Sequence, residues 1–236
     1  MRISFEDLII FEDDDFLVIN KPPFVASLDD RNDPRNVQQM AKVYDDRLSV
    51  CHRLDKETSG CLLLAKSDEA YRHASIQFEK RSVKKVYHAV ANGLHEFDRK
   101  VMDLSILPLK NGKVVIDIKD GKPAKTTFTT KEIYKRHSLI ECDLETGRMH
   151  QIRIHLAKLG APLVHDELYK GDKLYLSQIK RRYNLKEETE EQPLIKRFAL
   201  HAHSFSFDSF KERVQLEAEY PKDFRVLIKQ LRLNKR

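Results

Sequence analysis

One largely polar decade between two apolar runs constrains this chain most strongly. Residues 48–51 read as a short strand entering the decade, and residues 61–65 read as a buried strand leaving it. The decade itself is Cys51-His52-Arg53-Leu54-Asp55-Lys56-Glu57-Thr58-Ser59-Gly60. It must therefore be a loop held by two core strands, which is a common place for reactive groups.

Asp55 is the residue of this loop that could carry chemistry. It is the only acid between Asp46 and Glu57, and Arg53 and Lys56 flank it. Because a nearby cation favours the ionised carboxylate, we expect Asp55 to be charged at neutral pH, a state that suits a nucleophile or a base. The spacing by itself favours a plainer interpretation, a salt-bridged surface turn.

Length and charge set the broad class. A chain of 236 residues is one large domain or two small ones. The net charge of +6 favours a polyanionic partner without naming it. Three cysteines without a CxxC pair indicate reduced thiols of a cytoplasmic protein. The acidic start of the chain does not read as a signal peptide, and no apolar run approaches the roughly 20 residues that span a bilayer.

Apolar periodicity predicts a mixture of strands and helices. Strands are expected at 8–11, 16–19, 84–91, 104–109, 114–118, 125–134, 138–144, 197–207 and 214–218. Helices are expected at 37–44, 67–80, 149–159, 174–183 and 221–233. Ser67 is the expected N-cap of the second helix and Gly160 the C-cap of the third, while Asn111-Gly112 predicts a hairpin turn.

Two clusters invite a metal hypothesis, and neither supports it. Asp13, Asp14 and Asp15 are adjacent in sequence without a second cluster nearby, which is typical of a solvated turn. His150 and His155 are five residues apart and have no cysteine or acid at ligand spacing, so we reject zinc. The chain also lacks a P-loop and a dinucleotide fingerprint, and we expect neither metal nor cofactor.

Several motifs together resemble one known family. Residues 52–55, His-Arg-Leu-Asp, followed by Thr-Ser-Gly at 58–60, are similar to the central motif of the RluA-type pseudouridine synthases. Residues 146–156 resemble that family's Thr-Gly-Arg-x-His-Gln-Ile-Arg-x-His-Leu motif. Shorter matches are Asn-Lys-Pro at 20–22, Lys-x-Tyr-x-Ala at 85–89 and Leu-His-Ala at 200–202. The resemblance thus covers nearly the whole chain.

The chain departs from the family pattern at three places. The family usually has a glycine one or two residues after Asn-Lys-Pro, where this chain has Pro23 and Phe24. A glycine often stands in place of His165. Many members carry a small RNA-binding domain of the ribosomal S4 kind, and we expect none here because the catalytic pattern begins near residue 8.

The resemblance implies a fold and a set of roles. It implies one α+β catalytic domain over residues 1–236, with a mixed, largely antiparallel sheet, flanking helices and a central basic cleft. Within that domain, the charged character of residues 184–196 predicts a surface insertion. Asp55, Tyr87 and Arg153 would be the catalytic residues and converge in that cleft. Arg53 would fill the space left by a flipped base. RNA contacts are also assigned to His52, Lys21, Arg148 and His150.

The implied activity is isomerisation of uridine to pseudouridine in structured RNA by a monomeric, cytoplasmic enzyme. Ribosomal RNA of the 23S type and tRNA both remain open as substrates. One rival is a non-catalytic basic RNA-binding protein, in which Asp55 merely orders a loop. A second rival is a metal-dependent phosphodiesterase that uses residues 13–15.

Overall fold

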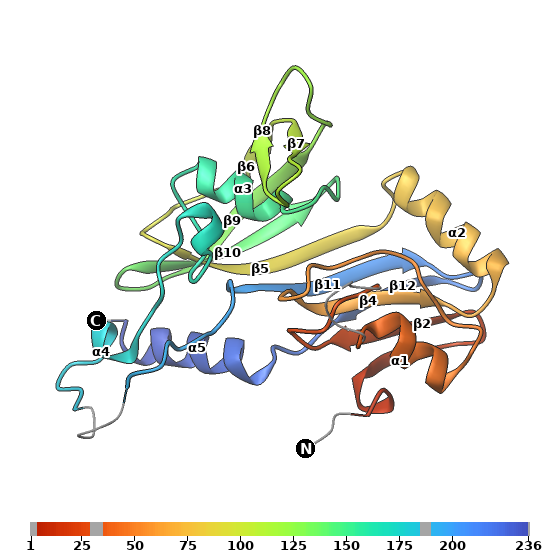
Figure 1. The fold of residues 1–236 in the computed structure, drawn as a ribbon, viewed down its shortest axis with the longest axis horizontal. Coiled ribbons are helices and arrows are strands. Elements are labelled where there is room, and N and C mark those ends of the chain that lie inside the picture. The colour runs from red at the N-terminus through yellow and green to blue at the C-terminus, as the bar shows by residue number, and fades with distance from the viewer. Residues whose placement is uncertain (1–3, 29–34, 185–189, 236) are drawn as a thin grey trace. The chain divides into compact units, whose positions relative to one another are not determined.

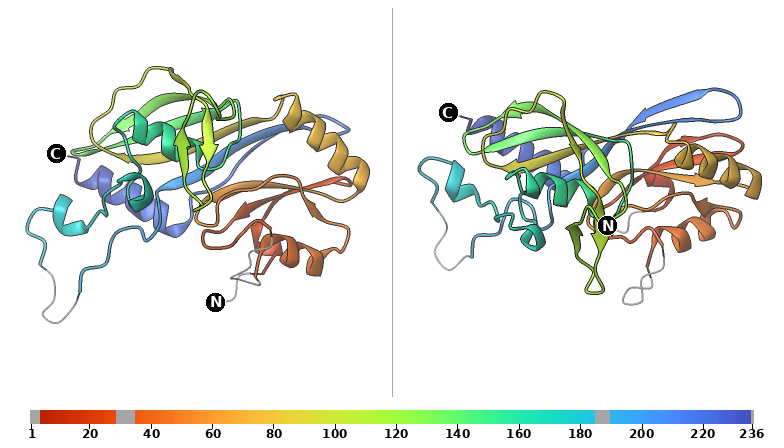
Figure 2. Two further views of the ribbon diagram at one scale, coloured as in Figure 1. Left: turned by 45° about the horizontal axis from the view of Figure 1, so that its top comes forward. Right: turned by 90° about the horizontal axis from the view of Figure 1, so that it is seen from above.

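The computed structural model describes residues 4–28, 35–184 and 190–235, and its backbone is drawn in Figures 1 and 2. The chain forms two compact units. The first comprises Met1–Tyr87 and His201–Tyr220, and the second comprises His88–Leu200 and Pro221–Arg236. The chain passes between the units three times: inside β5 (Lys84–Asn92), at the start of β11 (Leu200–Asp208) and between Tyr220 and Pro221. Each unit is therefore built from two separate segments.

A mixed sheet forms the centre of the first unit. Its strands are, in order, β1 (Ile9–Glu12), β2 (Phe16–Lys21), β4 (Ser59–Ala65), β11 and β12 (Arg213–Glu217), and β3 (Ser49–Val50) also pairs with β4. The β4–β11 pair is parallel, and the other pairs are antiparallel. Strand β2 pairs with β4 so that Lys21 lies opposite Gly60. The end of β2 and the start of β4, which both carry motif residues, therefore lie side by side.

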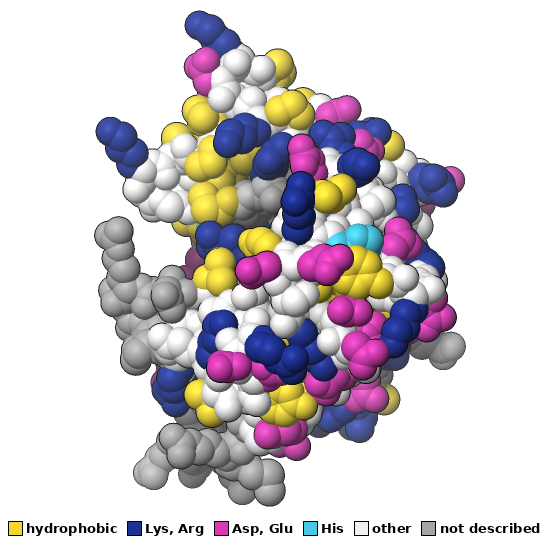
Figure 3. Space-filling model, turned by 90° about the vertical axis from the view of Figure 1, so that its right-hand side faces the viewer, with side chains coloured by type: hydrophobic (Ala, Val, Ile, Leu, Met, Phe, Trp, Pro, Cys, Tyr) yellow, Lys and Arg dark blue, Asp and Glu magenta, His cyan; other side chains and the backbone are white. Residues whose placement is uncertain are grey.

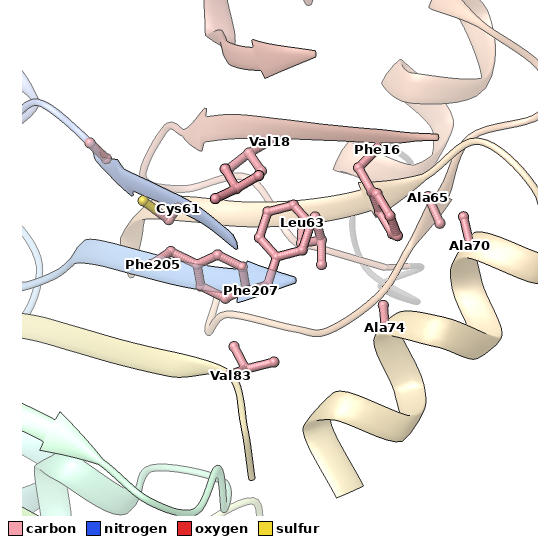
Figure 4. Close-up of a cluster of buried hydrophobic side chains, with 12 residues drawn as sticks. Phe16, Val18, Cys61, Leu63, Ala65, Ala70, Ala74, Val83, Phe205 and Phe207 are labelled. Atoms are coloured by element: carbon pink, nitrogen blue, oxygen red, sulfur yellow. The ribbon is translucent and has the colours of Figure 1, made fainter. Parts of the chain in front are cut away.

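The core of this sheet is buried on both faces. One face carries Phe16, Val18, Cys61 and Leu63, which pack with Phe205 and Phe207 in the cluster drawn in Figure 4. Alternate residues of β2 and β4 point to the opposite face. Those residues are also fully buried: Leu17, Ile19, Leu62 and Leu64. The unbroken apolar runs of these strands follow from burial on both faces.

Local capping signals set where the helices of the first unit begin. A short 3-10 helix η1 (Glu6–Leu8) precedes β1, and the α-helices are α1 (Val37–Tyr44) and α2 (Asp68–Glu79). Asn36 accepts a hydrogen bond from the Gln39 backbone N–H at 2.9 Å, and Ser67 accepts one from the Ala70 N–H at 3.1 Å. The expected cap at Ser67 is therefore confirmed.

The second unit contains further strands of the ten-stranded sheet and a separate two-stranded hairpin. The strand order is β5, β10 (His137–Leu144), β9 (Lys125–Ile133) and β6 (Lys100–Asp103). Strands β7 (Ile106–Pro108) and β8 (Val114–Ile116) form the hairpin, whose turn contains Gly112 at φ +80°. The Asn-Gly hairpin signal is thus confirmed. Strand β6 was not expected, because three of its four residues are exposed and give no alternating pattern.

Over its described residues, the second unit also contains three α-helices and one 3-10 helix. They are α3 (Gln151–Lys158), η2 (Glu167–Tyr169), α4 (Leu176–Ile179) and α5 (Lys222–Leu233). The choice of a helix for the second motif is confirmed by α3, which ends before Gly160 at φ +76°. Helix α5 buries the four residues expected of it, namely Phe224, Leu227, Ile228 and Leu231.

The structure corrects the helix expected at 174–183. Only α4 is helical there, since Lys180 has extended backbone angles and Arg182 has φ +53°. Leu174 and Ile179 are the buried residues of the segment, and their five-residue spacing does not make a continuous apolar stripe. Of the expected insertion at 184–196, residues 185–189 lie outside the described residues. Ile195 is buried, so the end of the segment packs into the unit.

The expected α+β class, with mixed and largely antiparallel strand pairing, is confirmed. Among the described residues, no helix is long and apolar enough to cross a membrane. Basic and acidic side chains are interspersed on the face shown in Figure 3. The central basic cleft and the single-domain organisation stay predictions.

Candidate active site

The Asp55 loop leaves β3 and is fastened on both sides of Asp55. Ser27 Oγ accepts from the Leu54 backbone N–H at 2.9 Å and donates to the Leu54 carbonyl at 3.0 Å. The Thr58 N–H donates to the Asp55 carbonyl at 3.0 Å and closes a turn. Asp55 itself is half-buried, and Arg53 is exposed. The carboxylate is therefore presented from a braced loop, as a reactive group requires.

Lys21 supports this loop from inside. Its side chain is fully buried, and Nζ donates to the carbonyls of Pro22, Val25 and Lys56 at 3.0, 2.7 and 3.2 Å. A buried ammonium needs such acceptors to offset its desolvation. Lys21 therefore supports the Asp55 loop, and the RNA contact expected of it stays a prediction.

His52 is also held as part of the scaffold. Its Nε2 accepts from the Leu63 backbone N–H at 3.1 Å, and its ring stacks on Phe205 with 5.3 Å between centroids and 8° between planes. Burial, with a smaller effect of the Lys85 charge, lowers the pKa of His52 to about 3. The imidazole is thus neutral at physiological pH, and the RNA contact expected of His52 stays a prediction.

Two distant pieces of the family motifs meet at the exit of the loop. Ser59 and Gly60 pair with His201 and Ala202 in parallel register, and Ser59 Oγ lies 2.9 Å from His201 Nδ1. Gly60 has φ +113°, and a β-carbon there would lie 2.1 Å from the Ala202 carbonyl oxygen. Glycine is therefore required by the close approach of β11.

Tyr87 is the last residue of the first unit's leading segment and lies on β5 with its side chain buried. A buried tyrosine combines a large apolar surface with one polar hydroxyl. That combination suits packing on a base, the role that we expect of it.

In the second unit, Arg153 is fixed by a bidentate ion pair. Its Nε and Nη2 donate to the two carboxylate oxygens of Asp166, each at 2.7 Å, and both side chains are buried. The guanidinium also lies over the rings of Tyr169 and Phe198, 5.0 and 4.1 Å from their centroids. Its position is therefore set on three sides.

Other residues of the second motif fasten α3 to β9. Gln151 Nε2 donates to the Lys125 carbonyl at 3.0 Å and to Thr126 Oγ1 at 2.9 Å, while its Oε1 accepts from Thr146 Oγ1 at 2.8 Å. His155 Nδ1 lies 3.0 Å from Thr126 Oγ1. Much of this motif thus maintains the fold around Arg153.

The two remaining RNA-contact candidates of this motif lie in different surroundings. His150 Nδ1 is 2.9 Å from the Tyr169 hydroxyl, so His150 and Arg153 are brought together on one tyrosine. Arg148 is exposed, and its Nε donates to the Pro123 carbonyl at 3.1 Å. The RNA contacts of both residues stay predictions, as does the convergence of Asp55, Tyr87 and Arg153.

The residues that replace family glycines keep the backbone conformation that glycine favours. Phe24 has φ +67° and His165 has φ +63°, both in the left-handed region. His165 Nδ1 also lies 2.6 Å from the Ile195 carbonyl oxygen. Both residues of this chain therefore adopt a backbone conformation that favours glycine.

Sequence reasoning missed Ser27, Asp166 and Tyr169. A buried arginine needs an acidic partner, but the chain contains 37 acids and spacing does not single out Asp166. Within the described ranges, no three His, Cys, Asp or Glu side chains are arranged to hold a metal ion. Asp13 Oδ1 instead accepts from the backbone N–H groups of Asp15 and Phe16, and Asp14 pairs with Lys211.

Comparison with known proteins identifies relatives over the same motifs. A family model described as RNA pseudouridylate synthase matches residues 15–158, a stretch that contains Asp55, Tyr87 and Arg153. Ribosomal large subunit pseudouridine synthase D of Neisseria meningitidis serogroup B is 35% identical over 95% of this chain. This chain spans 61% of that relative's length. An uncharacterized RNA pseudouridine synthase of Helicobacter pylori is 34% identical, over 92% of this chain and 76% of the relative.

Solved structures agree on the fold. Human RNA pseudouridylate synthase domain containing 4 matches with a TM-score of 0.73 at 24% identity, over 95% of this chain and 92% of that one. Human RNA pseudouridylate synthase domain containing 1 matches with a TM-score of 0.67 at 25% identity, over 90% and 83%. With the family model covering more than half of its residues, the chain belongs to the RNA pseudouridylate synthase family.

Proposed function

We propose that this protein isomerises uridine to pseudouridine in RNA and that Asp55 is the catalytic group. The observation that carries the proposal is the braced carboxylate: hydrogen bonds to Leu54 and Lys56 hold the chain on each side of Asp55. Family membership supports the reaction class. Arg153 and Tyr87 are proposed to serve the same site, one by charge and the other by packing on the base.

The reaction requires little beyond an ionised carboxylate beside the target nucleotide. The bond between ribose C1′ and uracil N1 breaks, the base turns, and C1′ joins uracil C5. Asp55 can attack C1′, attack uracil C6, or take a ribose proton, and all three routes begin from the ionised form. The anchored loop supplies the fixed direction that each of them needs.

We propose large-subunit ribosomal RNA as the substrate, with tRNA as the alternative. The Neisseria relative is named for the large ribosomal subunit, and this chain is similar to it over nearly all of its own length. The exposed Arg53 and the net charge of +6 suit a phosphate-rich partner. Sequencing that maps pseudouridines in RNA from cells with and without the protein identifies the target.

The test of the catalytic role is Asp55→Asn, which keeps the shape of the side chain and removes its charge. We expect loss of pseudouridine formation with the melting curve and the RNA affinity nearly unchanged. Glu57→Gln is the matched control, because it removes a charge from the same loop and should leave turnover intact. Substantial turnover by folded Asp55→Asn protein would mean that another group does the chemistry.

Two rival functions are separated by the same samples. A non-catalytic RNA-binding protein would bind RNA without forming pseudouridine in the wild type. A phosphodiesterase would cut RNA and lose activity with a chelator. The second rival is weakened by residues 13–15, because Asp13 closes a turn and Asp14 pairs with Lys211.

We further propose that the protein acts as a monomer in the cytoplasm. Its three cysteines are free thiols, and burial raises the pKa of Cys51 and Cys61 to about 12, which keeps them unreactive. Light scattering of the purified protein checks the monomer, and cell fractionation checks the compartment.

A further inference from the structure

Phe24 is an exposed aromatic residue in a conformation that disfavours it. Its side chain is 49% exposed, and its φ of +67° lies in the left-handed region. It follows Pro23 in a turn, and proline followed by a residue with positive φ is the pattern of a type II turn, which normally takes glycine at the second position. A β-carbon there costs about 1–2 kcal/mol. Phe24 thus exposes a large aromatic ring at a position whose backbone conformation favours glycine.

The turn that carries Phe24 is tied to the Asp55 loop at both ends. Three residues before Phe24, Lys21 donates to the Val25 carbonyl at 2.7 Å and to the Lys56 carbonyl at 3.2 Å. Three residues after it, Ser27 exchanges two hydrogen bonds with Leu54. Leu54 and Lys56 are the two neighbours of Asp55. Hydrogen bonds on each side of Phe24 therefore hold its backbone at a fixed place relative to the backbone of Asp55.

This arrangement suits recognition of a nucleobase. Every base offers a flat π-face, and an exposed aromatic ring on a rigid support can stack on it without reading the sequence. Phe24 belongs to the segment that is hydrogen-bonded to both neighbours of Asp55, so its ring can reach a nucleotide beside the uridine that Asp55 would hold. We propose that Phe24 stacks on a base of the bound RNA that neighbours the target uridine. The inference rests on the proposed function and adds a positioning residue to it.

The experiment measures whether removing the Phe24 ring and removing one base of the RNA weaken binding independently or jointly. Fluorescein-labelled single-stranded RNA oligonucleotides with one uridine are made intact and with an abasic nucleotide at each position within two of the uridine. Their affinities for the wild type, Phe24→Ala, Phe24→Leu and Phe24→Trp are measured by fluorescence anisotropy. Tyr71→Ala is the matched control, because Tyr71 is an aromatic residue of the same unit that is 42% exposed on α2.

Stacking predicts a specific pattern of losses. Phe24→Ala should weaken binding of the intact RNA roughly 5- to 150-fold. One abasic position should weaken wild-type binding by a similar factor and leave Phe24→Ala unaffected. Phe24→Trp should restore the affinity, Phe24→Leu should not, and Tyr71→Ala should bind as the wild type does. Melting curves show that the variants are folded, and Phe24→Gly, which relieves the backbone, provides a second ring-free protein.

The inference fails if every abasic position weakens the wild type and Phe24→Ala equally, or if Phe24→Leu binds as well as the wild type. Pseudouridine formation on total RNA from cells lacking the protein separates this result from the proposed function. If the wild type forms pseudouridine but the abasic positions affect the wild type and Phe24→Ala alike, only the stacking role of Phe24 is overturned. If one abasic position weakens binding only when Phe24 is present, yet the wild type forms no pseudouridine, the proposed isomerase activity is overturned and Phe24 is an RNA-binding residue alone.

Discussion

Replacing Asp166 with asparagine tests the buried ion pair that fixes Arg153. In the wild type, the Asp166 carboxylate accepts from Arg153 Nε and Nη2 at 2.7 Å each, and both side chains are almost fully buried. Asparagine has nearly the same shape, so packing is conserved while the negative charge is lost. The guanidinium then stays buried beside Tyr169 and Phe198 without the negative charge of Asp166.

The magnitude follows from that burial. Removing one partner of a buried ion pair destabilises a protein by about 3–5 kcal/mol, because the remaining charge is uncompensated. Asparagine retains one acceptor oxygen, so the low end, about 3 kcal/mol, is expected. For a chain of this length, that corresponds to a fall in Tm of about 6–12 °C. Asp143→Asn, an exposed change on β10, should alter the free energy of unfolding by less than about 0.5 kcal/mol.

The assay is urea and thermal unfolding followed by circular dichroism, with the double variant Arg153→Met, Asp166→Leu as the decisive sample. Apolar residues of similar size should recover most of the lost stability, since they remove both buried charges together. The double variant should nevertheless form no pseudouridine if Arg153 serves the catalytic site. A Tm for Asp166→Asn within 1–2 °C of the wild type would refute the argument, because a buried guanidinium cannot lose its partner at so small a cost.

Three further predictions concern the first unit. The pKa of His52 is about 3, below its ordinary value of 6.5, so the stability that the neutral ring contributes is complete above about pH 6.5. It is lost as the pH falls toward 3, by up to about 1.4 kcal/mol per pH unit. Between pH 6 and 4, the free energy of unfolding of His52→Phe should therefore fall with pH less steeply than that of the wild type, by that amount. Phe24→Gly should be more stable to urea than Phe24→Ala by about 1 kcal/mol, since only alanine places a β-carbon at φ +67°, and equal stabilities would contradict the strain. Arg53→Ala should slow single-turnover reaction strongly on a folded stem-loop and much less on an unstructured oligonucleotide, because its hole-filling role depends on a stacked base; equal losses on both RNAs would leave it as a phosphate contact.

Features that depend on neighbours in sequence could be predicted from the sequence. The Ser67 cap, the Asn-Gly hairpin and the apolar face of α5 each lie within a dozen residues, and all three are confirmed. The fold class follows from the same local patterns, and the family follows from motifs that are contiguous in the chain. The loop around Asp55 belongs here too, because it is flanked in sequence by two apolar runs, although β4 begins at Ser59 and the end of the decade is buried.

The direction and partner of each polar side chain could not be predicted in this way. Lys21 and His52 look like RNA contacts by charge and by place in a motif, yet one ammonium lies against three carbonyls and one ring stacks on Phe205. Whether a basic group faces solvent depends on which strands pack around it. In this unit those strands include β11, which is about 150 residues away from the Asp55 loop in sequence.

The sequence by itself determined the family, the class of fold and the residue proposed to do the chemistry, because these are written in contiguous motifs and periodic patterns. Tertiary structure alone decided that Arg153 pairs with Asp166, that Ser27 and Lys21 hold the loop around Asp55, and that Phe24 has a positive φ. The physical reason is that a buried charge takes whichever partner the fold brings within hydrogen-bonding distance, and many acids and carbonyls are equally eligible until the chain has folded.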